Sequence, residues 1–336
     1  MTRLHDPSRD ATDRIVPRSR RRVLCGVVAA GLLTLAACGS DTPAVAIPNV
    51  FSLEHDPTAA IDEPDPARGE VMRADVLRSQ LERELTWHGI TLTQVMRHAH
   101  AGDPAVQAWI EELTDNTDDL TAAVGLVYGT EEARAFYQQW AQHTQFLVDY
   151  AVAVSAGDDA AADRARARLA IYAADSGSFF AEVTDGALPS DAVQTLLDTH
   201  VGHMVEMIDA VERGDGGAAL ASALDDNAYL AEIATGLATA MASTQVTAFP
   251  GTIDTPEAAY CTIITTGTGS FLLRELFSRG TTTDASAASF EEETGVRLGD
   301  VIGVIDQLDS ADAILVAQTA DLALDRAFDH ARPPAP

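Results

Sequence analysis

Residues 200–215 read His-Val-Gly-His-Met-Val-Glu-Met-Ile-Asp-Ala-Val-Glu-Arg-Gly-Asp. The histidines and methionines fall at positions i, i+3, i+4 and i+7, which is one face of a helix. The closing Gly214-Asp215 pair predicts a turn, because Gly adopts the left-handed conformation after one helix and Asp caps the next. The stretch therefore predicts the first helix and the turn of an αα-hairpin.

A histidine followed fourteen residues later by Gly-Asp occurs three times in this chain. The copies lie 55 and 57 residues apart and are His88 with Gly102-Asp103, His143 with Gly157-Asp158, and His200 with Gly214-Asp215. Three matches at one offset indicate an internal repeat, and each unit is expected to be one αα-hairpin. The repeat predicts an all-α fold in which residues 68–245 form a helical bundle of three hairpins and six helices.

The rest of the folded part favours the same class. Apolar residues recur at helical spacing and strand signals are nearly absent. Pro250-Gly251 breaks the chain, and Thr255-Pro256 predicts a new helix with Thr as its N-cap and Pro at its first position. That helix is expected to reach about Arg279, and a last helical stretch is expected over about 300–330. Residues 246–336 are therefore predicted to be a helical C-terminal extension.

The N-terminus has the features of a secretory signal over residues 1–37. A basic segment with Arg20 and Arg21 precedes an apolar run over 23–37. These fifteen residues would measure about 22 Å as a helix, too short for the roughly 30 Å of a hydrocarbon core. The run ends in a sequence that resembles a bacterial lipoprotein cleavage motif, made of Leu35, Ala36, Ala37 and Cys38.

The signal predicts where the mature protein is found. Lipidated Cys38 would become the new N-terminus and anchor an extracytoplasmic protein to the cell membrane. The Ser-Arg-Arg-x-Val-Leu run over 19–24 resembles a twin-arginine signal, and a generic basic segment is the other reading. Residues 38–67 contain five prolines and many acids, so they are expected to form a tether rather than a packed core.

The chain is strongly acidic, with a formal net charge of −29, and every basic residue is Arg. Such a surface repels nucleic acid, which is excluded as a partner. The expected partners are the membrane, through the lipid anchor, and a second protein of the cell envelope. Cys261 is the one cysteine beyond Cys38, so neither a disulfide framework nor a cysteine-based metal cluster can be built.

Comparison of the three units singles out one equivalent position, which holds His88, His143 and His200. In the other two units, the positions equivalent to His203, Met204 and Met207 hold mostly apolar or small residues. Met204 and Met207 are therefore expected to pack in the core, and His203 to be a local addition. Any function of this region depends on the three equivalent histidines.

The second helix of each hairpin offers polar partners to these histidines. The two helices of a hairpin are antiparallel, so groups equally far from the turn lie at the same height. On this count His88 should face Asn116, and His200 should face Asn227. Asp175, the corresponding residue of the second unit, lies about one helical turn farther from its Gly-Asp turn than His143 does.

Two interpretations follow. In the first, each histidine donates to an Asn or Asp and forms a satisfied buried pair. In the second, the three histidines converge on a divalent metal ion, with Asp119 or Asp175 completing the ligand set. Asn116, Asn227 and His203 would then surround the ligands. Convergence requires a closed bundle, since the histidines of an open solenoid would lie about 10 Å apart.

Several short motifs resemble a family of uncharacterised all-helical bacterial proteins with repeated His-led helices. They are Trp87-His88, Asn116-x-x-Asp119-Leu120, Tyr128-Gly129 and the helices of His143 and His200. The resemblance covers about residues 77–243 and implies an all-helical fold. It implies no activity, and the fourth helix departs from the family pattern because Ala and Asp stand in place of its Asn-Ala pair.

Sequence motifs of common enzymes are not present. The chain has no nucleophile elbow, no P-loop and no dinucleotide fingerprint. The leading hypothesis is a non-enzymatic binding protein that holds a metal ion or a small ligand among the hairpins. The alternative is an interaction or scaffold protein of the cell envelope whose histidines are only structural, and an enzyme ranks third.

Overall fold

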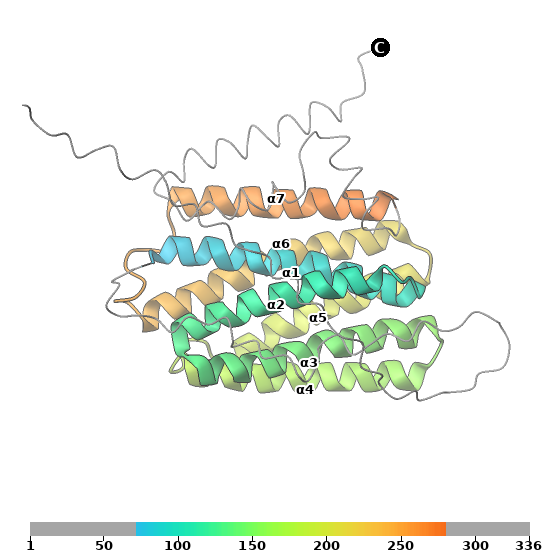
Figure 1. The fold of residues 1–336 in the computed structure, drawn as a ribbon, viewed down its shortest axis with the longest axis horizontal. Coiled ribbons are helices and arrows are strands. Elements are labelled where there is room, and N and C mark those ends of the chain that lie inside the picture. The colour runs from blue at the N-terminus through green and yellow to red at the C-terminus, as the bar shows by residue number, and fades with distance from the viewer. Residues whose placement is uncertain (1–71, 280–336) are drawn as a thin grey trace, which may run out of the picture. The chain divides into compact units, whose positions relative to one another are not determined.

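The computed structural model describes residues 72–279, which contain seven α-helices and no strand (Figure 1). The helices are α1 (Ala74–Ala101), α2 (Val106–Tyr128), α3 (Thr130–Ser155), α4 (Asp159–Val183), α5 (Ser190–Glu212), α6 (Gly216–Thr244) and α7 (Pro256–Arg279). The all-α prediction is confirmed. Across residues 72–279, no helix combines the length and the apolar character needed to cross a membrane. The predicted signal, Cys38, the tether and the last helical stretch lie outside the described residues.

The three Gly-Asp turns share one backbone geometry. Gly102, Gly157 and Gly214 have left-handed φ angles of 63°, 63° and 70°. In each turn the glycine N–H donates to the carbonyl three residues back, and the aspartate N–H donates to the carbonyl five residues back. This is the pairing of a Schellman motif. The turns join α1 to α2, α3 to α4 and α5 to α6, so the three predicted hairpins are present.

Two of the three aspartates cap the following helix. Asp158 and Asp215 each accept the N–H of the residue three positions on. Asp103 differs, since its side chain accepts from Ala105 and α2 begins only at Val106. Asp103 therefore caps a tight turn that precedes α2, and the α-helix itself begins three residues after the predicted N-cap. The carbonyls of residues 103 and 104 accept N–H groups three residues on, which is tighter than an α-helix.

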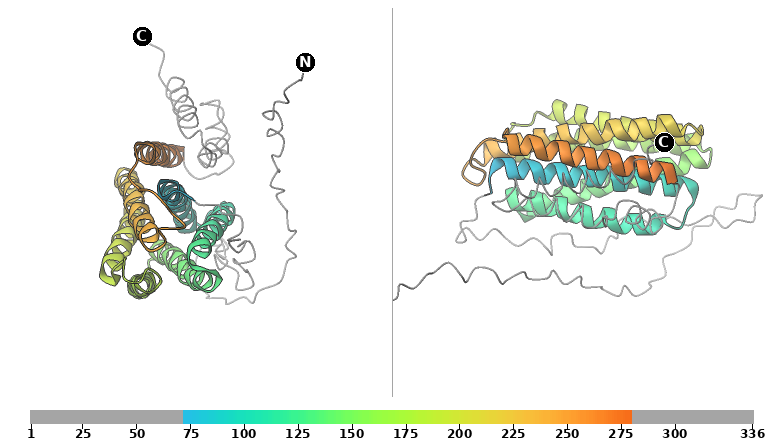
Figure 2. Two further views of the ribbon diagram at one scale, coloured as in Figure 1. Left: turned by 90° about the vertical axis from the view of Figure 1, so that its left-hand side faces the viewer. Right: turned by 90° about the horizontal axis from the view of Figure 1, so that it is seen from above.

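The six helices of the hairpins close into a ring (Figure 2). Each helix packs against the next along the chain, and α6 packs against α1. The odd-numbered helices α1, α3 and α5 also contact one another, so they form the inner wall of the ring. The bundle is therefore the closed arrangement that convergence of the histidines requires.

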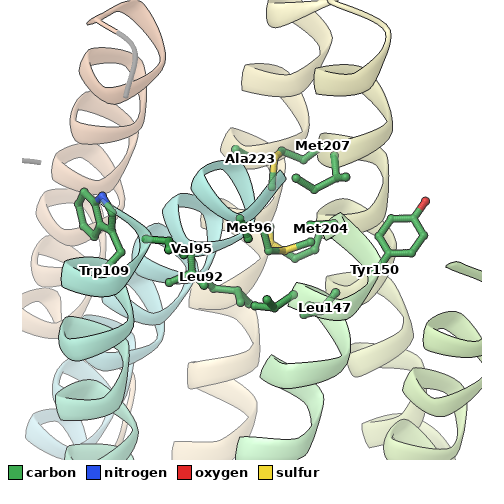
Figure 3. Close-up of a cluster of buried hydrophobic side chains, with 14 of the residues drawn as sticks. Leu92, Val95, Met96, Trp109, Leu147, Tyr150, Met204, Met207 and Ala223 are labelled. Atoms are coloured by element: carbon green, nitrogen blue, oxygen red, sulfur yellow. The ribbon is translucent and has the colours of Figure 1, made fainter. Parts of the chain in front are cut away.

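Two apolar clusters fill the bundle, one on each side of the repeat histidines. The first cluster, part of which is drawn in Figure 3, includes Leu92, Leu147, Met204 and Met207. The second cluster includes Leu85, Phe136 and Leu197, each three to seven residues before the histidine of its helix. Met204 and Met207 have no exposed surface, so their predicted place in the core is confirmed.

Helix α7 packs on the outside of the ring against α1 and α6. Its predicted start is confirmed, because the Thr255 hydroxyl accepts the N–H of Ala258. Gly269 allows a close approach to both neighbours. A Cβ at this position would lie 2.3 Å from Oδ1 of Asn227 in α6 and 2.8 Å from Cγ2 of Thr86 in α1. The contact of α7 with the ring therefore depends on this residue having no side chain.

Substitutions at two glycines of the third hairpin are expected to change stability in opposite directions. Gly214 has a φ of +70°, where a side chain costs about 1–2 kcal/mol, so Gly214→Ala should lower the free energy of unfolding by about that amount. Gly202 lies within α5 with no atom within 4 Å of an added Cβ, so Gly202→Ala should raise it by up to about 1 kcal/mol. Urea unfolding measures both changes. Unchanged or higher stability in Gly214→Ala would contradict the left-handed turn, and a loss in Gly202→Ala would contradict the open space beside Gly202.

Candidate metal centre

Helices α1, α3 and α5 each place one histidine at the centre of the ring, and we call His88, His143 and His200 the histidine triad. The three side chains are buried, with exposed fractions of 0, 1 and 3 %. Their ring centroids are 5.4 Å apart for His88 and His143, 6.0 Å for His88 and His200, and 6.4 Å for His143 and His200. One ring nitrogen from each residue lies within 4.8 Å of the other two. The three histidines of the repeat therefore meet at one point.

Several ring nitrogens of the triad have no hydrogen-bond partner among residues 72–279. They are both nitrogens of His88, Nδ1 of His143 and Nε2 of His200. Buried polar groups are nearly always paired, since an unpaired one costs about 1–3 kcal/mol. The triad as a whole does not form the satisfied core pairs of the first interpretation. Its unpaired nitrogens are the groups that a metal ion would need.

One carboxylate lies against the triad. Nδ1 of His200 and Oδ1 of Asp226, on α6, form a hydrogen bond of 2.7 Å. Asp226 is 1 % exposed, and the same oxygen lies 3.4 Å from Nδ1 of His203, which is partly exposed. A carboxylate bonded to one nitrogen of a histidine fixes the ring so that the opposite nitrogen can bind a metal. Asp226 would therefore orient Nε2 of His200.

Asn227 has a different partner from the predicted one. It donates to the carbonyl of Thr266 and the hydroxyl of Ser270, both in α7. The prediction that it faces His200 is wrong. One step along a helix turns the side chain by about 100°, so Asp226 points to the triad while the next residue points to α7.

Of the other predicted partners, Asn116 lies at the triad, whereas Asp119 and Asp175 do not. Asn116 is buried beside His88, although its amide donates to the backbone carbonyl and the carboxylate of Glu84. Asp119 and Asp175 lie on exposed faces of α2 and α4. Because the triad is buried, the prediction that either acid completes its ligand set is wrong.

Asp226 was not among the residues predicted from sequence, yet the sequence carries a signal for it. It falls on a stripe of α6 at helical spacing together with the buried residues Ala219, Ala223, Leu230 and Ile233. An acid on an otherwise apolar buried stripe needs a partner inside the protein. That criterion selects Asp226, whereas counting residues from the turn selected its neighbour.

Burial and the neighbouring side chains determine the protonation states of His88, His143 and Asp226. Burial lowers the pKa of His88 well below its ordinary value, and the nearby His143 and His200 lower it further. Burial, with His200 adding to it, lowers the pKa of His143 to about 3. Burial alone would raise the pKa of the Asp226 carboxyl, but His200 and His203 bring it below its ordinary value. Near neutral pH, His88 and His143 are therefore uncharged, as metal ligation requires, and Asp226 is a carboxylate.

Aromatic rings hold two members of the triad in place. Tyr172 of α4 stacks on His143 with centroids 4.7 Å apart and planes 14° from parallel. The Trp140 ring lies 4.6 Å from that of His88 and 4.7 Å from that of His143. These contacts restrict how far the imidazoles can rotate and leave few conformations to be lost when a ligand binds.

No family model, no curated protein and no solved structure matches this chain. The resemblance of residues 77–243 to a family with His-led helices stays a prediction. The function is therefore inferred from the geometry of the site.

Proposed function

We propose that this protein is a membrane-anchored, extracytoplasmic lipoprotein that binds a divalent transition-metal ion through His88, His143 and His200. The convergence of three buried imidazoles whose nitrogens lack partners within residues 72–279 is the observation that supports metal binding. Purely structural histidines of an envelope scaffold would be expected to satisfy these nitrogens.

The ligand set favours a transition metal. Three nitrogens bound at about 2.1 Å to a tetrahedral ion would lie about 3.4 Å from one another. The donor nitrogens of the triad lie within 4.8 Å, so an inward shift of roughly an ångström would bring them into place. Imidazole suits zinc, copper, iron and nickel, whereas calcium and magnesium prefer oxygen ligands. Three ligands leave a fourth coordination position open.

The charge of Asp226 also supports a bound cation. A carboxylate that is 1 % exposed is costly in a protein core unless a positive charge compensates it. His200 and His203 supply part of that compensation in the metal-free protein, and a divalent ion on the far side of the His200 ring would add to it. The arrangement is the carboxylate–histidine–metal sequence that orients ligands in many metal sites.

The proposed location rests on the N-terminal sequence. The apolar run over 23–37 and the cleavage motif that ends in Cys38 support export and lipidation. Mass measurement of the mature N-terminus and membrane fractionation of cells that carry Cys38→Ala test this part separately. A mature protein that keeps residues 1–37 or lacks lipid would overturn it.

Metal binding is tested on the full chain purified in detergent and treated with a chelator. The protein is titrated with Zn²⁺, Co²⁺, Fe²⁺ and Cu²⁺, and its metal content and melting temperature are measured. One ion per chain is expected. Metal at a hundredfold excess over its dissociation constant should add about 3 kcal/mol of stability and raise the melting temperature by roughly 5–10 °C. A chain that takes up none of these metals, with an unchanged melting temperature, would contradict the proposal.

Asp226→Asn is expected to weaken metal binding, and urea unfolding of the metal-free variant separates this effect from any change in the fold. Loss of a carboxylate behind a histidine ligand typically costs 10–100-fold in metal affinity, and we expect a fall of about that size. The metal-free variant should unfold at a lower urea concentration, because the fold holds the pKa of the Asp226 carboxyl below its ordinary value and the substitution weakens its pairing with His200 and His203. Asp225→Asn is the matched control, since the neighbouring Asp225 is exposed. Equal metal affinity in wild type and Asp226→Asn would show that this carboxylate does not support the site.

A further inference from the structure

A cavity of about 50 Å³ adjoins the histidine triad along the axis of the bundle. All six helices of the ring contribute to its wall, and His143 and His200 form part of it. The lining residues of α1, α3 and α5 include Leu85, Phe136 and Leu197, which come before the triad in the chain. The cavity therefore lies on the side of the second cluster, and one flank of the metal centre borders this space.

The wall of the cavity selects against charged ligands. Apart from the two histidines it consists of apolar and aromatic side chains, with no Asp, Glu or Arg. Transfer of a charge into such surroundings is strongly unfavourable. A water molecule needs about 10–15 Å³ of such space, so 50 Å³ accommodates a molecule of only a few non-hydrogen atoms. Apolar cavities in proteins stay free of water and take up xenon or small apolar molecules.

Besides the ring nitrogens of His143 and His200, the wall includes an indole donor without a partner. The indole N–H of Trp140 finds no acceptor among the described residues, although the side chain is only 8 % exposed. Trp140 lines the cavity and contacts His88 and His143, so it borders both the space and the triad. A small ligand that carries an oxygen atom would give this N–H an acceptor.

We propose that the cavity binds an uncharged diatomic molecule of the dioxygen and nitric oxide class, which takes the open position of the metal ion held by the triad. This inference rests on the proposed metal site. A molecule of this class fits the site in two respects. It is apolar enough for the cavity wall, and it has an atom that can bond to the metal ion. The Trp140 N–H donates to the bound ligand.

The cavity itself is tested without metal, with xenon as the probe. Xenon added to the metal-free full chain is expected to shift the methyl NMR signals of Leu85 and Ile233, which line the cavity, and not those of Leu147 in the first cluster. The double variant Val124→Ile and Val193→Ile adds two methyl groups to the cavity wall and should abolish these shifts. Val148→Ile, in the first cluster, is the matched control. Xenon shifts that are absent, or that persist in the double variant, would overturn the proposal.

Ligand binding at the metal is tested with nitric oxide on the Fe²⁺-loaded full chain, followed by its absorption and EPR spectra. An iron–nitrosyl signal is expected in the wild type and in Val148→Ile, with a lower affinity in the double variant. Trp140→Phe should weaken nitric oxide binding about fivefold, the loss of one hydrogen bond of about 1 kcal/mol. If iron binds and nitric oxide does not, the inference fails while the metal site stands. If no metal binds, both fail, and the xenon result still shows whether the cavity is real.

Discussion

Replacing His88 with alanine is expected to reduce metal affinity at least 100-fold. Structural zinc sites with four ligands bind with about 10–16 kcal/mol, which is roughly 3 kcal/mol for each ligand. His88 is the most informative member of the triad, because among the described residues it is in no ion pair and its polar neighbour on α2 is the neutral amide of Asn116, so the substitution removes a ligand and breaks little else. The loss should therefore appear in metal titrations and in the disappearance of the metal-induced rise in melting temperature.

The control for this substitution is His100→Ala. His100 lies on the same helix, three turns further on, and its Nε2 contacts Glu212 at 2.8 Å, away from the triad. His100→Ala should bind metal like the wild type. His88→Gln is made in parallel, because it keeps more of the side-chain volume and separates loss of a ligand from loss of packing. Wild-type affinity in both His88 variants would rule out His88 as a ligand.

Acidification is expected to destabilise the metal-free protein strongly. The pKa of His143 falls from 6.5 in the unfolded chain to about 3 in the folded one, so the unfolded state binds more protons between these values. The stability from keeping this ring neutral is complete above pH 6.5 and is lost as the pH falls towards 3. The loss from about pH 7 to about pH 4.5 should be on the order of 3 kcal/mol from this residue.

The other groups of the centre modify this fall. The lowered pKa of His88 acts in the same direction as that of His143, and the lowered pKa of Asp226 adds a loss at still lower pH. The raised pKa of His203, whose first cause is its interaction with Asp226, acts in the opposite direction. Urea unfolding at the two pH values, with a chelator present, measures the sum. His143→Phe should lose much less stability on acidification, and an equal loss in wild type and variant would contradict the assignment.

The hairpins could be predicted from sequence because each Gly-Asp pair determines its turn locally. Gly214 supplies the left-handed residue and Asp215 the cap, and both effects act within a few residues. Closure of the ring could not be predicted in the same way. It depends on packing between α1 and α6, at opposite ends of the repeat, and no local pattern specifies it. Convergence of the triad therefore follows from closure of the ring and not from any local pattern.

The partners of the triad show that counting residues from a turn predicts the height of a side chain along its helix better than its direction. Distances from the turn gave the correct height for Asn116 but selected Asn227 in place of Asp226, an error of one residue. A step of one residue changes the height along a helix by only about 1.5 Å, whereas it turns the direction of the side chain by about 100°. The predictions for Asp119 and Asp175 were wrong for the same reason, because the height of a residue along its helix does not determine which face of the helix it occupies. Burial periodicity within each helix carries that information.

The division of the triad among three hairpins has a consequence for how the protein matures. A growing chain holds only two of the ligands until α5 has formed, and the ring cannot close until α6 meets α1. An ion bound at the triad would thus enter late, after the last hairpin has docked. Once there, its binding free energy would oppose the separation of any one hairpin from the other two. The slowest amide protons to exchange with solvent should then belong to α1, α3 and α5, and metal should slow all three helices together.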